Sequence, residues 1–420
     1  SFPAADARMD VRTFIDDPRV RATIDALRRD AGDRVLSDIV DDSGRQYVDL
    51  VMEGGGVLGI ALVGYTYALE CLGIRFLGIG GTSAGSINAL LMAALDRLDQ
   101  PKSHRILDWL AEIDLFAFVD GDGDARRMVE AIVEKAGTPT LVFRGAQVLD
   151  NLFGQLGLNP GDVFSQWIKE RLAEVGIATY RDLRERMGPS DGVRLRSRDG
   201  RILSEGELDA RLSMVAAELT TESKVDFPRM APLYWSDPDR VNPAEFVRAS
   251  MSIPVLFHPF RVRSLPKGPS AERQWSTLAH YSGPIPDEVI FVDGGTISNF
   301  PIDLFHQPGV PLAPTFGVKL GLERNAPRNI RGPVEFLRAL FEAARNGADT
   351  DFLVKHRDYR NLIAYIQTGE HYWLDFRLTP EAKVDLFARG VETAADFVRR
   401  FDWERYKRIR ANLEQAERES

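Results

Sequence analysis

The chain has 420 residues, 44% of them hydrophobic, which is enough to bury one large core or two smaller ones. Its formal net charge is −9 and its pI is near 5.4, which argues against a nucleic-acid-binding protein, because such proteins usually present a basic face. No apolar run approaches the roughly 20 residues that span a bilayer, and the first residues show no signal peptide, so we expect a cytoplasmic protein.

The first half of the chain predicts a helical extension followed by alternating strands and helices. Residues 1–45 are charged, with apolar side chains at three- and four-residue steps, and we expect them to form an N-terminal helical extension. Tyr47–Met52 is a short apolar run suited to a buried strand. A glycine-rich loop and a helix over Ile60–Leu72 follow, and Arg75–Ile79 begins a second strand that leads into another helix. This order predicts an α/β fold with three α/β/α layers and a mostly parallel central sheet.

The second half contains further strands between helical segments. Residues 100–190 read as a mostly helical insertion, 266–283 as a surface loop, and the chain after residue 332 as helical again. Four apolar runs predict strands: Ser213–Leu219, Ile253–Phe257, Val289–Val292 and Pro314–Leu320. There is no interdomain linker. We therefore expect one catalytic domain over 46–330, with the helical part at 331–420 packed on the same domain.

The most informative stretch is Gly81-Thr82-Ser83-Ala84-Gly85, which follows the second strand and opens a helix. A serine at the apex of such a turn projects its hydroxyl from the carboxyl end of a strand. The small neighbours allow the tight turn and let a substrate approach the backbone. The helix dipole and free N–H groups favour negative charge there, as acyl transfer requires. The pattern predicts that Ser83 is a nucleophile.

The loop Gly54–Gly59 after the first strand allows two interpretations. As Gly-x-Gly-x-x-Gly it matches a dinucleotide fingerprint, but that reading needs a ribose-binding acid at the end of the second strand. The second strand ends at Ser83 instead, with no acid. The alternative is an oxyanion hole, in which the unshielded N–H groups of Gly55 and Gly56 point at an ester carbonyl oxygen. The neighbouring serine favours the oxyanion hole.

A serine nucleophile needs a base, and the sequence offers two solutions. Asp293 ends an apolar run and is followed by two glycines, so it could accept the serine proton directly. A conventional triad would use a downstream histidine, His306, His356 or His371, although none lies in a Gly/Ser-rich loop. The six histidines form no close pair with metal-ligand spacing, so we expect neither a metal nor a cofactor.

Taken together, these residues resemble the patatin-like phospholipases, and in particular bacterial-type patatin domain proteins. The resemblance spans roughly residues 47–320, with the motifs in the expected order. It rests on Gly54–Gly59, Gly81–Gly85, Asp293-Gly294-Gly295, Asn299, Pro301 and the segment Ala249–Pro254.

The resemblance implies a Ser83–Asp293 dyad without histidine, on a three-layer fold, that hydrolyses acyl esters of lipids as a phospholipase A or lysophospholipase does. The glycines at 54, 59, 81, 85, 294 and 295 and the side chain of Asn299 would then support the two catalytic residues. One position departs from the family pattern: Leu58 stands where the family commonly carries Arg or Lys. Such a cation would help to hold the oxyanion or a lipid phosphate, so its absence weakens the inference to phospholipid.

Three hypotheses remain. The first is the dyad hydrolase, the second is a non-phospholipid carboxylesterase with a Ser–Asp–His triad, and the third is a catalytically silent scaffold. We expect a lipid or phospholipid substrate and no nucleic acid as partner. Peripheral membrane contact of the active form and control by an oligomer or a regulatory ligand are compatible with the sequence. Ser250 and Ser252 are expected to serve capping or turn roles, and Glu53 a structural one.

Overall fold

The computed structural model describes residues 9–113, 115–123, 154–204, 206, 211–321, 343, 347 and 349–419. The expected helical insertion therefore lies partly outside the described residues, as do the first eight residues and most of 322–348. Among the described residues, no helix combines the length and the apolar character needed to cross a membrane.

The centre of the fold is a sheet whose strands run in the order β12-β11-β2-β3-β6-β10-β9. β2 (Gln46–Met52) and β3 (Ile74–Thr82) lie in the middle, and every residue in both is buried. Strands covered on both faces need mostly apolar side chains, and buried polar exceptions here such as Gln46, Asp49 and Arg75 are hydrogen-bonded. The other members of this order are β6 (Arg211–Glu218), β9 (Phe260–Arg263), β10 (Glu288–Asp293), β11 (Thr315–Leu320) and β12 (Ile363–Ile366).

The α/β class is confirmed, but the expectation of a mostly parallel sheet is only partly correct. The pairs β12–β11, β11–β2, β2–β3 and β3–β6 are parallel. β10 runs antiparallel to both β6 and β9. The short strands β1 (Ile39–Asp41), β5 (Leu195–Ser197) and β7 (Ser223–Phe227) also pair antiparallel. The connection explains one of these reversals: α3 joins the parallel strands β2 and β3, whereas a tight turn links β6 to β7 and reverses the chain.

Helices of the first half cross between the central strands. α3 (Gly59–Cys71) joins β2 to β3, and α4 (Ala84–Leu95) packs on β3 and β6. Both helices are buried almost all round, so neither shows the single apolar stripe of a surface helix. The remaining elements here are α5 (Ser103–Glu112), η2 (Leu115–Phe118), β4 (Gly157–Asn159), α9 (Asp162–Glu174) and α10 (Tyr180–Arg186).

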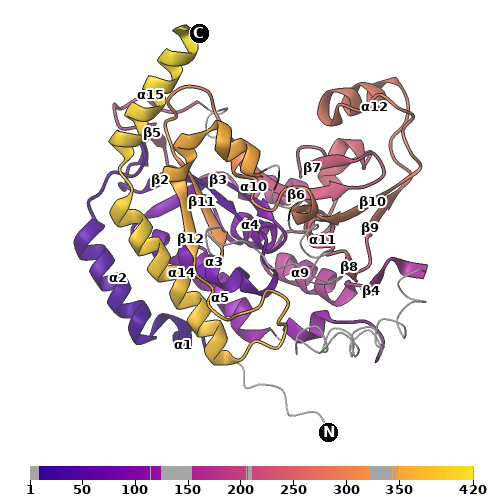
Figure 1. Ribbon diagram of the computed structural model, residues 1–420, viewed down its shortest axis with the longest axis horizontal. Helices are drawn as coiled ribbons and strands as arrows, with labels where there is room; N and C mark the ends of the chain where they lie inside the picture. Colours follow the sequence, from indigo (N-terminus) through magenta and orange to yellow (C-terminus); the bar gives the residue numbers. More distant parts are fainter. Residues whose placement is uncertain are drawn as a thin grey trace.

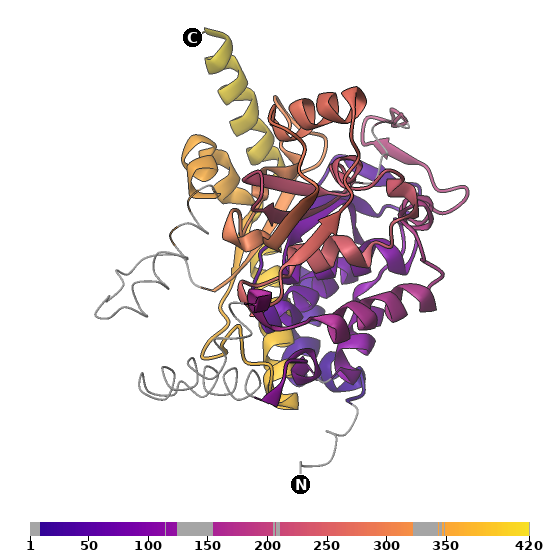
Figure 2. The ribbon, with the colours of Figure 1, turned by 90° about the vertical axis from the view of Figure 1, so that its right-hand side faces the viewer.

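The N-terminal extension and the C-terminal helices meet along one edge (Figure 1). α1 (Arg12–Ile15) and α2 (Pro18–Ala31) contact α14 (Pro380–Arg400). α2 starts at Asp17, whose carboxylate caps the amides of Arg19 and Val20, and a proline at the first helical position strengthens that start. α14 in turn packs on α3, and α15 (Trp403–Glu419) projects past the rest of the molecule (Figure 2).

The segment expected to be a surface loop, 266–283, contains helical structure instead. α12 (Pro269–Gln274) continues into one π-helical turn, η5 (Trp275–Ala279). Trp275 is buried and packs against Tyr234 and Tyr281, so this apolar anchor outweighs the Gly/Pro/Ser content that suggested a loop.

The run Ile253–Phe257 forms the short strand β8 (Val255–Phe257). It pairs with β4 outside the main sheet, and Val255 is half exposed. The remaining elements are α11 (Ala244–Ser250) and the short helical turns η1 (Gly56–Leu58), η3 (Ala231–Leu233), η4 (Pro238–Arg240), η6 (Gly294–Thr296), η7 (Ile302–Phe305) and η8 (Arg357–Leu362).

Candidate active site

Ser83 lies between the last residue of β3 and the first of α4, as the sequence predicts. Its backbone has φ 51° and ψ −116°, in the left-handed half of conformational space that residues other than glycine rarely adopt. Such strain costs about 1–3 kcal/mol and persists where the surroundings enforce it, which is common at functional sites. The side chain is buried, with 4% of the residue exposed.

The glycines on either side of the serine make this turn possible. A Cβ on Gly81 would lie 2.6 Å from the carbonyl oxygen of Met52, and a Cβ on Gly85 would lie 2.2 Å from the same oxygen. The end of β2 therefore packs directly against the backbone of the turn. Any side chain at either position would push β2 and the turn apart, which explains the Gly-x-Ser-x-Gly spacing physically.

Ser250 holds the backbone of the serine turn. Its hydroxyl accepts a hydrogen bond from the Ser83 amide at 3.0 Å and donates one to the carbonyl oxygen of Val215 in β6 at 2.6 Å. Ser250 is fully buried at the end of α11. The sequence singled out this serine as a turn or capping residue, and the structure shows that it ties the strained residue to the neighbouring strand.

Replacing Ser250 by alanine should lower kcat by about tenfold or more at nearly constant KM, because two buried backbone groups lose their partner and the turn relaxes. Ser37 is the matched control: it is equally buried and bonds two backbone groups, the Tyr47 carbonyl and the Ile39 amide, near the other end of β2. Both alanine variants should lose about 1–3 kcal/mol in urea unfolding. A fall in kcat for Ser37→Ala equal to that for Ser250→Ala would contradict the positioning role.

Asp293 is the last residue of β10 and lies level with the serine turn. Thr82 pairs with Val215 in β6, and the next residue of β6, Ala216, pairs with Asp293 from the other side. The Asp293 carboxylate accepts the Gly295 amide at 2.7 Å, and the Asp293 amide donates to the Ser252 carbonyl oxygen at 2.8 Å. The aspartate is therefore fixed in the backbone on both sides and is 5% exposed.

The loop after Asp293 returns across β6 to the serine turn. A Cβ on Gly294 would lie 3.0 Å from the Thr82 methyl carbon and 2.0 Å from the carbonyl oxygen of Val215. The Thr82 hydroxyl donates to the Ser298 carbonyl oxygen at 2.9 Å. The Asp-Gly-Gly motif thus lies against the residue before Ser83, and only glycine at 294 allows this approach.

Asn299 joins this loop to the glycine-rich loop. The Asn299 carbonyl oxygen accepts the Gly54 amide at 3.0 Å, and its side-chain amide donates to the Gly54 carbonyl oxygen at 3.2 Å. A Cβ on Gly54 would lie 3.2 Å from the Ser83 Cβ. The three motifs found in the sequence, which are up to 245 residues apart, therefore converge around Ser83.

The backbone amides of the two candidate oxyanion glycines, Gly55 and Gly56, differ from the amide of the residue that follows them. The amides of Gly55 and Gly56 donate no hydrogen bond to any part of the chain that the structure describes, whereas the next amide, Val57, donates to the Trp373 carbonyl oxygen at 3.1 Å. Gly56 has φ +55°, and a Cβ there would lie 2.2 Å from the same oxygen. Gly59 packs against Ala84, so it brings the two helix starts together.

Two neighbouring residues of the glycine loop are structural. The Glu53 carboxylate accepts the Leu320 amide at 2.6 Å and pairs with Lys319 at 2.9 Å, which fastens the loop to β11. This agrees with the structural role expected for Glu53. Leu58 is buried in the apolar core, where the family pattern has a cation.

Residues near the site that the sequence reasoning missed come from the last third of the chain. Asp349 accepts the Ser298 hydroxyl at 2.6 Å and the Phe300 amide at 2.7 Å, so it holds the loop after Asp293. Burial raises the pKa of Asp349 although both hydrogen bonds oppose this. Trp373 lies over the glycine loop. Neither residue belongs to a local motif, and nothing in the sequence points to them.

Each histidine considered as a base has a partner of its own. His306 shares a hydrogen bond of 2.8 Å with the Tyr359 hydroxyl, and its pKa is lowered by burial and by the neighbouring His356. His356 stacks on Phe352. His371 bonds the Asp385 carboxylate at 2.9 Å.

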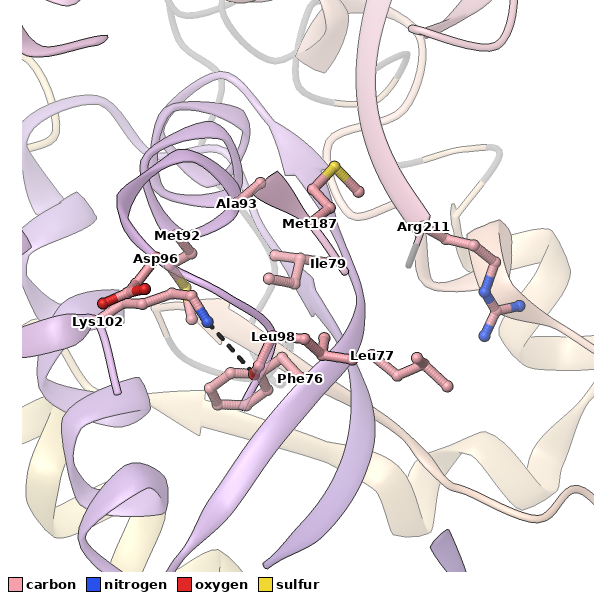
Figure 3. A pocket seen from close by; sticks show the side chains of 10 residues that line it. All are labelled: Phe76, Leu77, Ile79, Met92, Ala93, Asp96, Leu98, Lys102, Met187 and Arg211. Atoms are coloured by element: carbon pink, nitrogen blue, oxygen red, sulfur yellow. Dashed lines mark hydrogen bonds between the residues drawn. The ribbon is translucent and has the colours of Figure 1, made fainter. Parts of the chain in front are cut away.

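A separate hollow lies between β3, α4 and Lys102, but it is too small for a substrate (Figure 3). Its volume of about 20 Å³ suits roughly one water molecule. Lys102 is buried there and donates to the carbonyl oxygens of Gln100 at 3.0 Å and Leu98 at 3.4 Å. Desolvation lowers the pKa of Lys102 to about 8, although Glu70 opposes the shift.

This lysine predicts a pH dependence of stability. Between about pH 8 and about pH 10.5 the unfolded chain holds a proton on Lys102 that the folded chain has released. The free energy of unfolding of wild type should therefore rise with pH in that window, relative to Lys102→Met. Urea unfolding across the window measures the difference, with the exposed Lys355→Met as control. A difference between wild type and Lys102→Met that stays flat across the window would contradict the prediction.

A model of the patatin-like phospholipase family matches residues 50–306. The uncharacterized protein YqhO of Bacillus subtilis (strain 168) is 27% identical over 371 residues, which cover 85% of this chain and all of YqhO.

Among solved structures, the type III effector ExoU is similar over 87% of this chain and 55% of its own, with 16% identity and a TM-score of 0.36. The ExoU–SpcU complex of Pseudomonas aeruginosa matches over 85% of this chain and 52% of the other chain, with 16% identity and a TM-score of 0.35. The chain spans about half the length of ExoU.

Proposed function

Because the chain belongs to the patatin-like phospholipase family, we propose that it is a serine lipid acyl-hydrolase of the phospholipase A or lysophospholipase type. Ser83 is the nucleophile and Asp293 its base. The observation that carries this proposal is the strained Ser83 backbone, held by Ser250 at the point where the glycine loop and the Asp-Gly-Gly loop meet. Strained backbone of this kind is common at functional sites, and here it coincides with the meeting point of the three motifs.

The proposed reaction has two halves. In the first, the Ser83 oxygen attacks the ester carbonyl carbon while its proton passes to the Asp293 carboxylate. The carbon–oxygen bond to the alcohol then breaks, and the alcohol leaves with that proton. In the second, water attacks the acyl-serine and gives a proton to Asp293. The fatty acid leaves, and the serine oxygen recovers the proton.

The negative oxygen that develops on the carbonyl is assigned to the amides of Gly55 and Gly56. Two features support this assignment: the amides have no acceptor in the described chain, and the loop packs beside Ser83. Preorganised backbone donors of this kind contribute about 3–4 kcal/mol each to transition-state stabilisation.

The dyad is favoured over a Ser–Asp–His triad because His306 and His371 are engaged with Tyr359 and Asp385, and His356 packs on Phe352. The backbone contacts of Asp293 also support it, since they hold this residue at the end of β10, and the following Gly294 lies against Thr82, the residue that precedes Ser83.

The substrate is an acyl ester of a lipid, reached at a membrane or micelle surface. Because Leu58 is buried and apolar, the glycine loop supplies no cation at that position for a head-group phosphate. We therefore expect phosphatidylcholine and an uncharged monoacylglycerol to be hydrolysed with efficiencies that differ by no more than about tenfold.

A fluorophosphonate probe tests the function directly. The proposal predicts covalent labelling of wild type at Ser83, mapped by peptide mass spectrometry, and release of fatty acid from both lipids. Ser83→Ala should not label, whereas the exposed Ser276→Ala should label like wild type. Absence of labelling together with absence of fatty-acid release would instead favour the silent scaffold.

A further inference from the structure

Besides the small hollow beside Lys102, three open hollows among the described residues differ in charge. The hollow between β12 and α14 is lined by Arg389 and Arg400 but also by Glu392 and Asp396, so its charges balance. The hollow between α1, α2 and α14 has three acids, Asp17, Glu381 and Asp385, around Arg19. The third, between η8, the end of α14 and the start of α15, has an excess of cations.

We propose that this third hollow binds a phosphate-bearing anion. It is lined by three arginines from three separate elements, Arg360, Arg400 and Arg405, whereas Asp402 is the only acid among the described residues that line it. Within the part of the chain that the structure covers, none of the three guanidinium groups forms an ion pair. The whole chain has a net charge of −9, but the lining of this hollow is net positive. A concave surface lined by one sign of charge focuses the electrostatic field and attracts a small ion of the opposite sign.

Neighbouring acids are already occupied and do not neutralise the hollow. Asp358 pairs with Arg410, Glu404 with Lys407, and Asp396 with Arg399. Asp402 accepts the Arg405 amide at 2.8 Å, at the start of α15. The three arginines thus remain available to an external ligand.

One of the three arginines is held in place by the rest of the fold. The Arg400 guanidinium donates to the Ile363 carbonyl oxygen at 2.7 Å and lies 5.4 Å from the centre of the Phe397 ring. Phe401 and Tyr406 are buried beneath the arginines. A cation fixed in this way loses little side-chain freedom on binding, and planar guanidinium groups bind phosphate oxygens in pairs.

Size and position limit the ligand. The cavity of about 140 Å³ suits one phosphate group with a short substituent, below the 300–1,000 Å³ range of drug-sized ligands. It also lies far from Ser83: Trp373 contacts the glycine loop shortly before α14 begins, and Arg400 ends that 21-residue helix, about 30 Å away. β12 agrees with this placement: its first residue, Ile363, accepts a hydrogen bond from Arg400, whereas its last residue, Ile366, accepts one from the Gly321 amide just after β11.

A phosphate at this end cannot be the head group of the lipid being cleaved. The group that the hollow would recognise is a phosphate monoester. Either a soluble metabolite or the head group of another lipid can present this group. Because one flat bilayer cannot contact both ends of the molecule, the geometry favours a soluble phosphate compound. The inference does not depend on the proposed hydrolase activity.

Calorimetric titration of the full chain with inorganic phosphate tests the pocket. Wild type should bind saturably, and Arg360→Gln and Arg405→Gln should each weaken binding by about tenfold or more. Arg408→Gln is the matched control, since Arg408 is exposed on the same helix but does not line the hollow. Thermal unfolding of each variant checks the fold. No saturable binding to wild type, in solution or on vesicles, or equal weakening by Arg408→Gln, would overturn the proposal.

Vesicle sedimentation separates the two sources of phosphate. Phosphatidylcholine vesicles with and without phosphatidic acid are compared for the same four proteins. Binding of free phosphate without preference for phosphatidic acid supports the pocket with a soluble ligand. Arg360-dependent sedimentation with phosphatidic acid, in the absence of free-phosphate binding, supports the pocket and assigns it to head groups.

Discussion

Replacing Ser83 by alanine should lower kcat for acyl-ester hydrolysis by about a thousandfold or more, because the attacking oxygen is lost. Asp293→Asn should lower kcat by between about a hundredfold and ten-thousandfold, because the amide keeps an oxygen for the Gly295 N–H but cannot take up a proton. The two residues act as one unit, so the double variant should be no slower than Ser83→Ala alone. Initial rates with a fluorogenic acyl ester and with phosphatidylcholine measure these effects.

Controls separate chemistry from folding. Asp287→Asn changes an almost fully exposed carboxylate six residues before Asp293 and should retain wild-type rates. Alanine at His306, His356 or His371 should leave kcat within about threefold of wild type, since the proposed mechanism uses no histidine. Loss of activity in one of these histidine variants, with the fold intact, would favour the triad. Full activity in Ser83→Ala or Asp293→Asn would exclude the dyad.

The second large effect concerns stability. Gly64→Ala and Gly390→Ala should each destabilise the protein by about 3 kcal/mol or more, because α3 and α14 cross with their backbones in contact. A Cβ on Gly64 would lie 2.0 Å from the Phe387 carbonyl oxygen, and a Cβ on Gly390 would lie 2.0 Å from that of Ala61. Backbone atoms cannot yield as side chains do, so the helices must separate. Urea unfolding measures the change.

A helical glycine with free space around it provides the reference. An added Cβ on Gly154 meets no atom of the described residues within 4 Å, so Gly154→Ala should leave stability unchanged or raise it by up to about 1 kcal/mol. Gly64→Ala and Gly390→Ala should destabilise the same contact, so their effects should not add. A Gly64→Ala protein as stable as wild type would show that the two helices can shift apart at little cost.

The parts of the fold that the sequence predicts are those with strong local patterns. β2, β3, β6, β10 and β11 all lie within one to three residues of the apolar runs that predicted them. Continuous burial on both faces leaves an unmistakable pattern at these positions. The short strands β1, β5 and β7 have no such run, because their pairing is decided by partners far along the chain.

The residues of the candidate site also divide into those that belong to a local sequence motif and those that do not. The sequence names Ser83, Asp293, Asn299 and the glycines of the three motifs, because each occupies a turn that few residue types can form. It does not reveal that the Ser250 hydroxyl accepts the Ser83 amide, since a buried serine at a helix end looks the same whether it bonds locally or across the core. Asp349 and Trp373 are beyond prediction for a stronger reason: their contacts with the site depend wholly on how the last hundred residues fold back.

The contact between the Trp373 carbonyl oxygen and the Val57 amide has a consequence for judging related chains. All the family motifs end before residue 306, yet the outer side of the glycine loop is formed by Leu320 and Trp373, and the aspartate loop is held by Asp349. A homologue that keeps every motif but ends early would carry the reactive groups without the residues that hold the glycine loop and the aspartate loop in place. The smallest piece worth expressing, crystallising or screening for inhibitors is therefore the whole chain through α14.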